Sequence, residues 1–137
     1  MNKRKLKLDE YGISKKRYKE LCGFCEQYPE WKEKLANESF LRSLQYGDEP
    51  QPSNHNNSDT TAAHAIRLLK YKKNIELIEK VAKQADAAIW QYLIKSACYE
   101  VPIQYLISYW GLPMESNAFY TRRRYFFYLL DQEKNKE

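Results

Sequence analysis

Apolar residues recur at helical spacing in several stretches of this chain, and no stretch shows a sustained alternation of apolar and polar positions. The first such stretch follows Ser14, a residue type that favours the cap position at the start of a helix. Its apolar face consists of Tyr18, Leu21, Cys22, Cys25 and Tyr28. The pattern therefore predicts a first helix that begins after residue 14.

A second short helix is predicted from Pro29, because proline is tolerated in the first turn of a helix. Trp31 and Leu35 give this helix an apolar stripe. Turn-forming residues then dominate residues 46–58, where no apolar period survives. This segment is expected to be a linker or a long exposed loop.

A third helical stretch is expected after a cap at Asp59 or Thr60. Its apolar positions follow a broken helical period that predicts a kink near residues 71–74, and they are Ile66, Leu69, Ile75, Ile78 and Ala82. Asp86 is the expected cap of a further helix. The inward positions of that helix are Ile89, Trp90, Leu93, Ile94 and Ala97.

The last third of the chain predicts a short helix, a turn marked by glycine and a longer helix. Pro102 opens the short helix, Gly111 ends it, and the longer helix begins near Pro113 or Ser116. This order is that of a helix-turn-helix, whose second helix enters the DNA major groove. The fold class is therefore all-α, in small helical domains with a C-terminal helix-turn-helix at about residues 102–131. The expected organisation is a basic arm and short helical segment at 1–46, a linker at 47–59 and a helical domain at 60–137.

The longer helix has two faces of different character. Phe119, Phe126 and Leu130, with Phe127 beside them, are expected to face the core. The opposite face is expected to carry Asn117, Thr121, Arg124 and Tyr128. On such a face Arg and Asn can reach guanine and adenine edges, and Thr can contact a thymine methyl. The alternative is a solvated basic face on a helix of the core.

Arg122 and Arg123 flank the predicted buried face. Their stems can run along apolar surface while their guanidinium groups contact phosphates or an acid such as Glu100 or Glu115. These two residues are therefore predicted to position the helix on DNA rather than to read its sequence.

The same segment resembles the C-terminal part of small phage and prophage regulators of the ArpU and RinA type. The resemblance is carried by Gly111-Leu112-Pro113 and by the run from Phe119 to Leu130, with its three arginines among aromatic residues. It covers roughly the final 50 residues. Those regulators end in a helix-turn-helix similar to region 4 of sigma factors. The resemblance implies a DNA-binding protein of a phage or mobile element, acting as a transcriptional regulator.

Charge supports a polyanionic partner. The net charge is +5, and residues 1–19 alone hold eight Lys or Arg against two acids, while residues 116–128 hold three arginines and no acid. Lys3, Arg4 and Lys5 are expected to add phosphate contacts from a flexible arm over residues 1–12.

No apolar run is long enough to span a bilayer, and the basic start is not followed by the apolar region of a secretory signal. The expected location is cytoplasmic.

The residues that could act in catalysis or bind a metal do not form a pattern typical of an enzyme. Cys22 and Cys25 lie on the apolar stripe of the first helix, where free cysteine packs as a small hydrophobe. A zinc site would need four ligands, and Cys98, His55 and His64 at their spacings fit no common zinc finger. Neither paired carboxylates nor a glycine-rich phosphate loop is present. The sequence predicts no enzyme, no metal and no cofactor.

Two other functions stay open. Twelve tyrosines, with Tyr105, Tyr109 and Trp110 on the short helix and its turn, also suit a protein-binding hot spot. The chain is then an adaptor or inhibitor that docks on RNA polymerase or another host protein. A small terminase subunit is the third hypothesis, since such a subunit also uses a helix-turn-helix. Double-stranded DNA is the expected partner under the first hypothesis, and the oligomeric state is not predicted.

Overall fold

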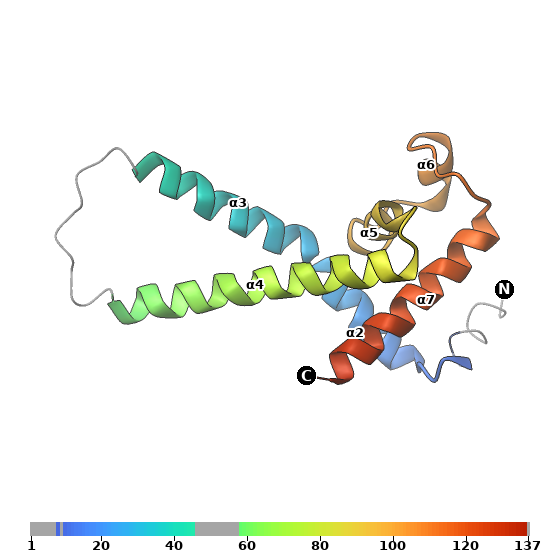
Figure 1. Cartoon of the computed structure of the whole chain (residues 1–137), viewed down its shortest axis with the longest axis horizontal. Helices are drawn as coiled ribbons and strands as arrows, with labels where there is room; N and C mark the ends of the chain where they lie inside the picture. Colours follow the sequence, from blue (N-terminus) through green and yellow to red (C-terminus); the bar gives the residue numbers. More distant parts are fainter. Residues whose placement is uncertain (1–7, 9, 46–57, 137) are drawn as a thin grey trace.

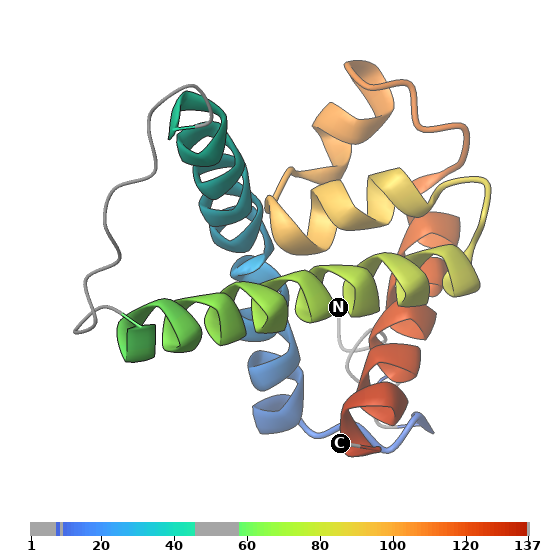
Figure 2. The ribbon, with the colours of Figure 1, turned by 60° about the vertical axis from the view of Figure 1, so that its left-hand side comes forward.

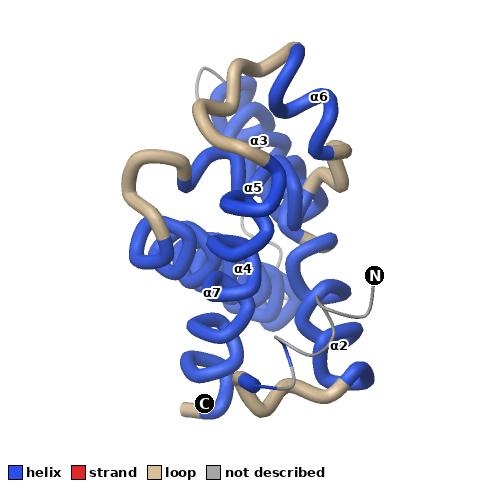
Figure 3. Tube along the Cα trace, turned by 90° about the vertical axis from the view of Figure 1, so that its right-hand side faces the viewer, coloured by secondary structure: helices blue, strands red, loops and turns tan. Residues whose placement is uncertain are grey.

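Ser14 caps the helix that follows it, as the sequence predicts. The structure, a computed structural model, describes residue 8, residues 10–45 and residues 58–136, without the side chains of 39–45 and 58–60. Helix α2 spans Lys15–Glu26, and the Ser14 hydroxyl accepts a hydrogen bond from the backbone N–H of Arg17 at 3.1 Å. Helix α3 spans Tyr28–Gln45, with Pro29 in its first turn. In the described part of the chain all regular elements are helices, which confirms the all-α fold class (Figure 3).

Helix α4 is the longest helix and runs without interruption over Ser58–Ala85. The predicted kink near residues 71–74 is therefore wrong. Ile66 and Leu69, expected to face the core, are 69% and 59% exposed. The reason is visible in Figure 1: α3 and the first half of α4 form a hairpin that extends away from the other helices. Only one side of α4 is covered there.

Helix α5, Trp90–Cys98, follows a turn that Asp86 caps. The Asp86 carboxylate accepts a hydrogen bond from the backbone N–H of Ala88 at 2.9 Å, whereas the cap residue of α5 itself is Ile89. Asp86 therefore caps the turn before the helix rather than the helix. The predicted inward face is correct for Leu93, Ile94, Ala97 and the cap residue Ile89, which are buried, while Trp90 is half-buried.

Helices α6 (Ile103–Ser108) and α7 (Ser116–Asn135) make up the C-terminal third of the chain. Gly111 follows α6 with a φ of 74°, a left-handed conformation that favours glycine. The next residue, Leu112, is buried and its N–H donates to the Leu106 carbonyl at 2.8 Å. The connection at residues 109–115 is longer than the roughly 3–4-residue turn typical of a helix-turn-helix.

The helices on both sides of the expected domain boundary share one hydrophobic core. Helix α2 packs against α5 and α7, while α4 packs against α3, α5 and α7. The core residues include Leu21 and Cys25 from α2, Ile78 from α4, and Phe119 and Phe126 from α7. Figure 2 shows α4 crossing α2 and α7. Residues before 46 therefore contribute to the same core as residues after 60.

An ion pair fastens the start of α2 to the end of α7. The Arg17 Nε donates to Asp131 Oδ1 at 2.6 Å, and Arg17 Nη2 donates to the Asn135 side chain at 3.0 Å. Lys80 of α4 likewise donates to Glu133 at 2.6 Å. The position of α7 is thus set by contacts with two other helices.

The predicted linker and arm fall mostly outside the described residues. Residues 46–57 of the linker and residues 1–7 and 9 of the arm are not described, while residues 58 and 59 belong to α4. Leu8 and Tyr11 pack against the core, so the expectation of a free arm is wrong for this end of it. None of the described helices combines the length and the apolar character that crossing a membrane requires.

Candidate nucleic-acid interface

The predicted contact stripe on α7 is exposed at one end and covered at the other. Asn117 and Thr121 are exposed. Arg124, expected to lie mid-face in solvent, is only 9% exposed, so that expectation is wrong. Tyr128 is half-buried and stacks on Tyr11, with ring centroids 4.9 Å apart and planes inclined by 29°. The residues just before α2 pack over this part of α7, which the helical period of α7 alone could not reveal.

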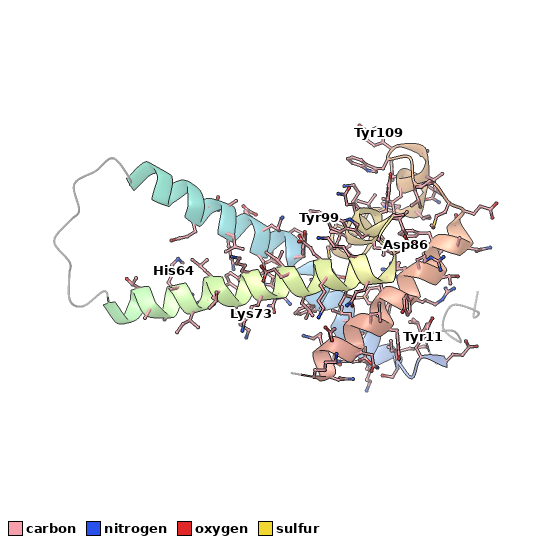
Figure 4. The ribbon with its side chains drawn as sticks, in the orientation of Figure 1. Tyr11, His64, Lys73, Asp86, Tyr99 and Tyr109 are labelled. Carbon is pink, nitrogen blue, oxygen red and sulfur yellow. The ribbon has the colours of Figure 1, made fainter. Side chains whose placement is uncertain are left out.

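The three consecutive arginines have different surroundings. Arg122 is half-exposed, and its Nε donates to Asp86 Oδ2 at 3.0 Å. Because Asp86 also caps the turn before α5, this ion pair connects the beginning of α7 to the α4–α5 junction, where Figure 4 shows Asp86. The expected acids, Glu100 and Glu115, are not the partners that the structure gives to Arg122.

Arg123 is held inside the helix packing. Its Nη1 donates to the Tyr18 hydroxyl at 2.7 Å and its Nε donates to the Ser96 hydroxyl at 3.0 Å. Its guanidinium carbon lies 4.9 Å from the centroid of the Phe127 ring, a cation–π distance. Arg123 therefore ties α7 to α2 and α5 and has little freedom to reach a phosphate.

Arg124 donates from Nη2 to the Thr121 hydroxyl at 3.1 Å. That hydroxyl in turn donates to the backbone carbonyl of Asn117 at 3.0 Å. The exposed and covered halves of the stripe are therefore linked by hydrogen bonds along one side of α7.

A small polar and basic surface remains at the start of α7. We call Asn117, Thr121 and Arg122 the α7 tip. No acidic residue lies in the first turn of α7, and the cap residue, Glu115, makes no capping hydrogen bond with its side chain. The N-terminus of a helix carries a partial positive charge that favours anions. The α7 tip can offer an arginine, an amide and a hydroxyl to an anionic surface, beside the exposed carboxylate of the cap residue Glu115.

The basic residues expected in the arm divide into two groups. Lys3, Arg4 and Lys5 lie outside the described residues. Lys15 and Lys19 are exposed on the first turns of α2, a helix whose first turn holds no acid. The described basic residues of the N-terminal part are thus fixed on a helix that packs against α7.

A second exposed surface is aromatic. Tyr109 is 76% exposed at the end of α6, where Figure 4 shows it projecting from the molecule. Tyr105 and Trp110 are 59% and 48% exposed, and the Tyr109 and Trp110 rings meet edge to face at 5.4 Å. The Lys95 ammonium lies 4.5 Å from the Trp110 ring centroid. This surface, Tyr105 with Tyr109 and Trp110, is the one on which the protein-docking hypothesis rests.

The cysteines lie in the packing of α2 and α5. Cys25 and Cys98 are buried and unbridged, and a hydrogen bond between their thiols, together with burial, raises the pKa of Cys25 well above its ordinary value. A thiol with a raised pKa is a poor nucleophile and metal ligand. Within the described residues no group of three or more acidic, histidine or cysteine side chains is placed to hold a metal.

His64 lies beside an acid of the neighbouring helix. Its Nε2 lies 3.1 Å from Glu38 Oε2, and the pair bridges α4 and α3 within the hairpin. His64 lies on the part of α4 that extends away from α7 (Figure 4). This contact serves the packing of two helices.

Sequence reasoning missed the partners that fix the arginines. Tyr18, Ser96 and Asp86 come from three other helices or turns and are separated from α7 by long stretches of chain. Helical period gives the direction of a side chain but not the element it meets.

Comparison of the chain with family models, curated proteins and solved structures finds no match.

Proposed function

We propose that this protein binds double-stranded DNA through the α7 tip. The observation that carries the proposal is the exposure of Asn117 and Thr121 on one face of α7, with Arg122 exposed on the adjoining face and no acid in the first turn after the Glu115 cap. Each of these side chains is of a type that contacts base edges or phosphates. The buried side of the same helix is anchored by Phe119 and Phe126. A rigid helix with a polar tip is the arrangement that major-groove readers use.

The Arg122–Asp86 ion pair is compatible with this role. Arg122 is half-exposed and Asp86 is 18% exposed, so the pair lies between an exposed pair, which contributes about 0–1 kcal/mol, and a buried one. A guanine edge or a phosphate that takes Arg122 must also compensate for the cation that the mostly buried Asp86 loses. Arg123, by contrast, holds α7 in place, and its role in DNA binding is positional.

The similarity to ArpU- and RinA-type regulators leads us to propose transcriptional regulation in a phage or prophage as the setting for this activity. It rests on Gly111-Leu112-Pro113 and on the aromatic and arginine run of α7. The long 109–115 connection departs from the usual turn. A packaging role, as in a small terminase subunit, is the less favoured setting.

Fluorescence anisotropy with a labelled duplex tests the proposal. The affinity should fall steeply between about 50 and 200 mM salt, because each neutralised phosphate releases counterions. Arg122→Gln should weaken binding by about 1–3 kcal/mol. The matched control is Lys73→Gln, which removes the same charge from the side of α4 that faces away from α3 (Figure 4). Equal effects of the two variants would mean that the α7 tip is not the contact.

A protein-docking function is the second candidate, favoured by the exposure of Tyr109 and Trp110. Exposed Trp and Tyr side chains are enriched among residues that dominate protein interfaces. Tyr109→Ala with Trp110→Ala separates the two functions. If DNA affinity is retained in this double variant while binding to purified RNA polymerase is lost, the aromatic surface serves a protein partner.

A further inference from the structure

A cavity of about 540 Å³ lies between the first turns of α2 and the middle of α7. Its walls come from α7, from α2 and from the segment just before α2, and its volume is in the range of small-ligand pockets. Four cationic side chains line it: Lys15, Lys19, Arg123 and Arg124. The described residues that line it include no carboxylate.

Arg124 places a nearly buried positive charge in the wall of this cavity. Arg124 is only 9% exposed, and its guanidinium donates one hydrogen bond, to the neutral Thr121 hydroxyl. No acid pairs with it among the described residues. Burial of a charge is costly unless a counter-charge and hydrogen bonds compensate it. Its planar guanidinium matches the oxygens of a phosphate or carboxylate in a two-point contact.

The other lining residues indicate which groups a ligand needs besides an anion. Leu8, Ile13 and Phe127 give the cavity an apolar side. The α2 N-terminus, capped by Ser14 and without an acid in its first turn, adds a partial positive charge at the cationic side. A ligand with one anionic end and one apolar or aromatic end satisfies both sides.

We propose that this cavity binds a phosphate group carried on a nucleoside-sized body, with Arg124, Lys15 and Lys19 as the phosphate contacts. The base and sugar would pack along Leu8 and Tyr18, which line the cavity and are only partly buried. Such a phosphate comes either from a free nucleotide or from a nucleotide within DNA at the edge of the α7 contact. The inference goes beyond DNA binding by the α7 tip and does not require it, because a free nucleotide occupies the cavity by itself.

Isothermal titration calorimetry on the full chain tests the pocket with deoxyadenosine monophosphate, deoxyadenosine and inorganic phosphate. A short duplex forms the fourth arm. We expect the monophosphate to bind and deoxyadenosine to bind much more weakly, since only the former has the anion. Lys15→Gln with Lys19→Gln should weaken binding at least about tenfold, because two charge-assisted contacts are lost.

The control variant is Lys16→Gln with Lys73→Gln, which removes the same charge from two exposed residues that do not line the cavity. It should leave nucleotide binding near the parent value. Arg124→Gln should abolish binding. If that variant does not fold, the lysine variants still decide the question.

The arms distinguish the source of the phosphate. If the monophosphate binds, and the cavity variant weakens this binding while the control does not, the site is assigned to a free nucleotide. Binding of the duplex alone, with the same dependence on Lys15 and Lys19, assigns it to DNA. If neither ligand binds, or if the cavity and control variants behave alike, the proposal is overturned. If the parent protein binds the monophosphate but not the duplex, the proposed DNA binding is contradicted and the proposed nucleotide site stands.

Discussion

The ion pair between Arg17 and Asp131 provides the sharpest test of how α2 holds α7. The Nε–Oδ1 distance is 2.6 Å, and the side chains are 28% and 11% exposed. Exposed pairs contribute about 0.2–1 kcal/mol. Removing one partner of a buried pair costs about 3–5 kcal/mol, because the other charge is left buried without compensation. This pair lies between those limits.

Arg17→Gln should therefore lower the free energy of unfolding by about 2 kcal/mol, since Asp131 is nearly buried and loses its cation. Asp131→Asn should cost less, about 1 kcal/mol, because Arg17 keeps contact with water and the amide oxygen still accepts a hydrogen bond. For a chain of this length 1 kcal/mol corresponds to a shift of about 3–5 °C in Tm. The double variant should show a coupling of about 1 kcal/mol.

Urea denaturation followed by circular dichroism measures these quantities. The control is Glu20→Gln, because Glu20 lies 3.6 Å from the same guanidinium but is 68% exposed. Its loss should cost less than about 0.5 kcal/mol. A coupling near zero, or a Glu20 variant as damaging as the Asp131 variant, would refute the reasoning that this contact fastens α2 to α7.

Three further contacts lead to predictions about stability. Tyr28 donates to Glu79 at 2.6 Å, so Tyr28→Phe should cost about 1–2 kcal/mol in urea denaturation. Burial, and then the hydrogen bond to Glu79, raises the pKa of Tyr28; the parent should therefore lose stability as the pH rises above about 10, and the variant should lose less. Hydrogen bonds from two lysines lower the pKa of Glu133 to about 2, so its contribution is present above about pH 4.5 and lost as the pH falls toward 2. Glu133→Gln should flatten Tm across that window. Tyr11→Ala removes the stack on Tyr128 together with the burial of the Tyr11 ring and should cost at least about 0.5–1.5 kcal/mol; an unchanged Tm would mean that the segment before α2 is not anchored there.

The boundaries that the sequence predicts best are those with a local chemical cause. The Ser14 cap and Pro29 in the first turn of α3 each act within a few residues, and both are found in the structure. Gly111 lies in the turn after α6 with a left-handed φ, but the helix ends earlier, at Ser108. The all-α class follows from the same local signals.

The predictions that failed depended on contacts between distant segments. Ile66 and Leu69 look like core positions by spacing, but they lie on a hairpin that no other described helix covers on that side. Arg124 and Tyr128 follow the period of the exposed face, yet Arg124 is only 9% exposed and Tyr11 stacks on Tyr128. No periodicity within one helix could indicate which neighbour would cover it.

The central claim is that duplex DNA contacts the α7 tip, and a magnetic-resonance titration of isotope-labelled protein with a short duplex tests it most directly. The account predicts that the largest shifts of backbone amide signals fall at Asn117, Thr121 and Arg122, with little change at Tyr109 and Trp110. The shifts should diminish as salt is raised, because phosphate contacts release counterions. Shifts confined to the aromatic residues at the end of α6, or no shifts at all at low salt, would contradict the claim.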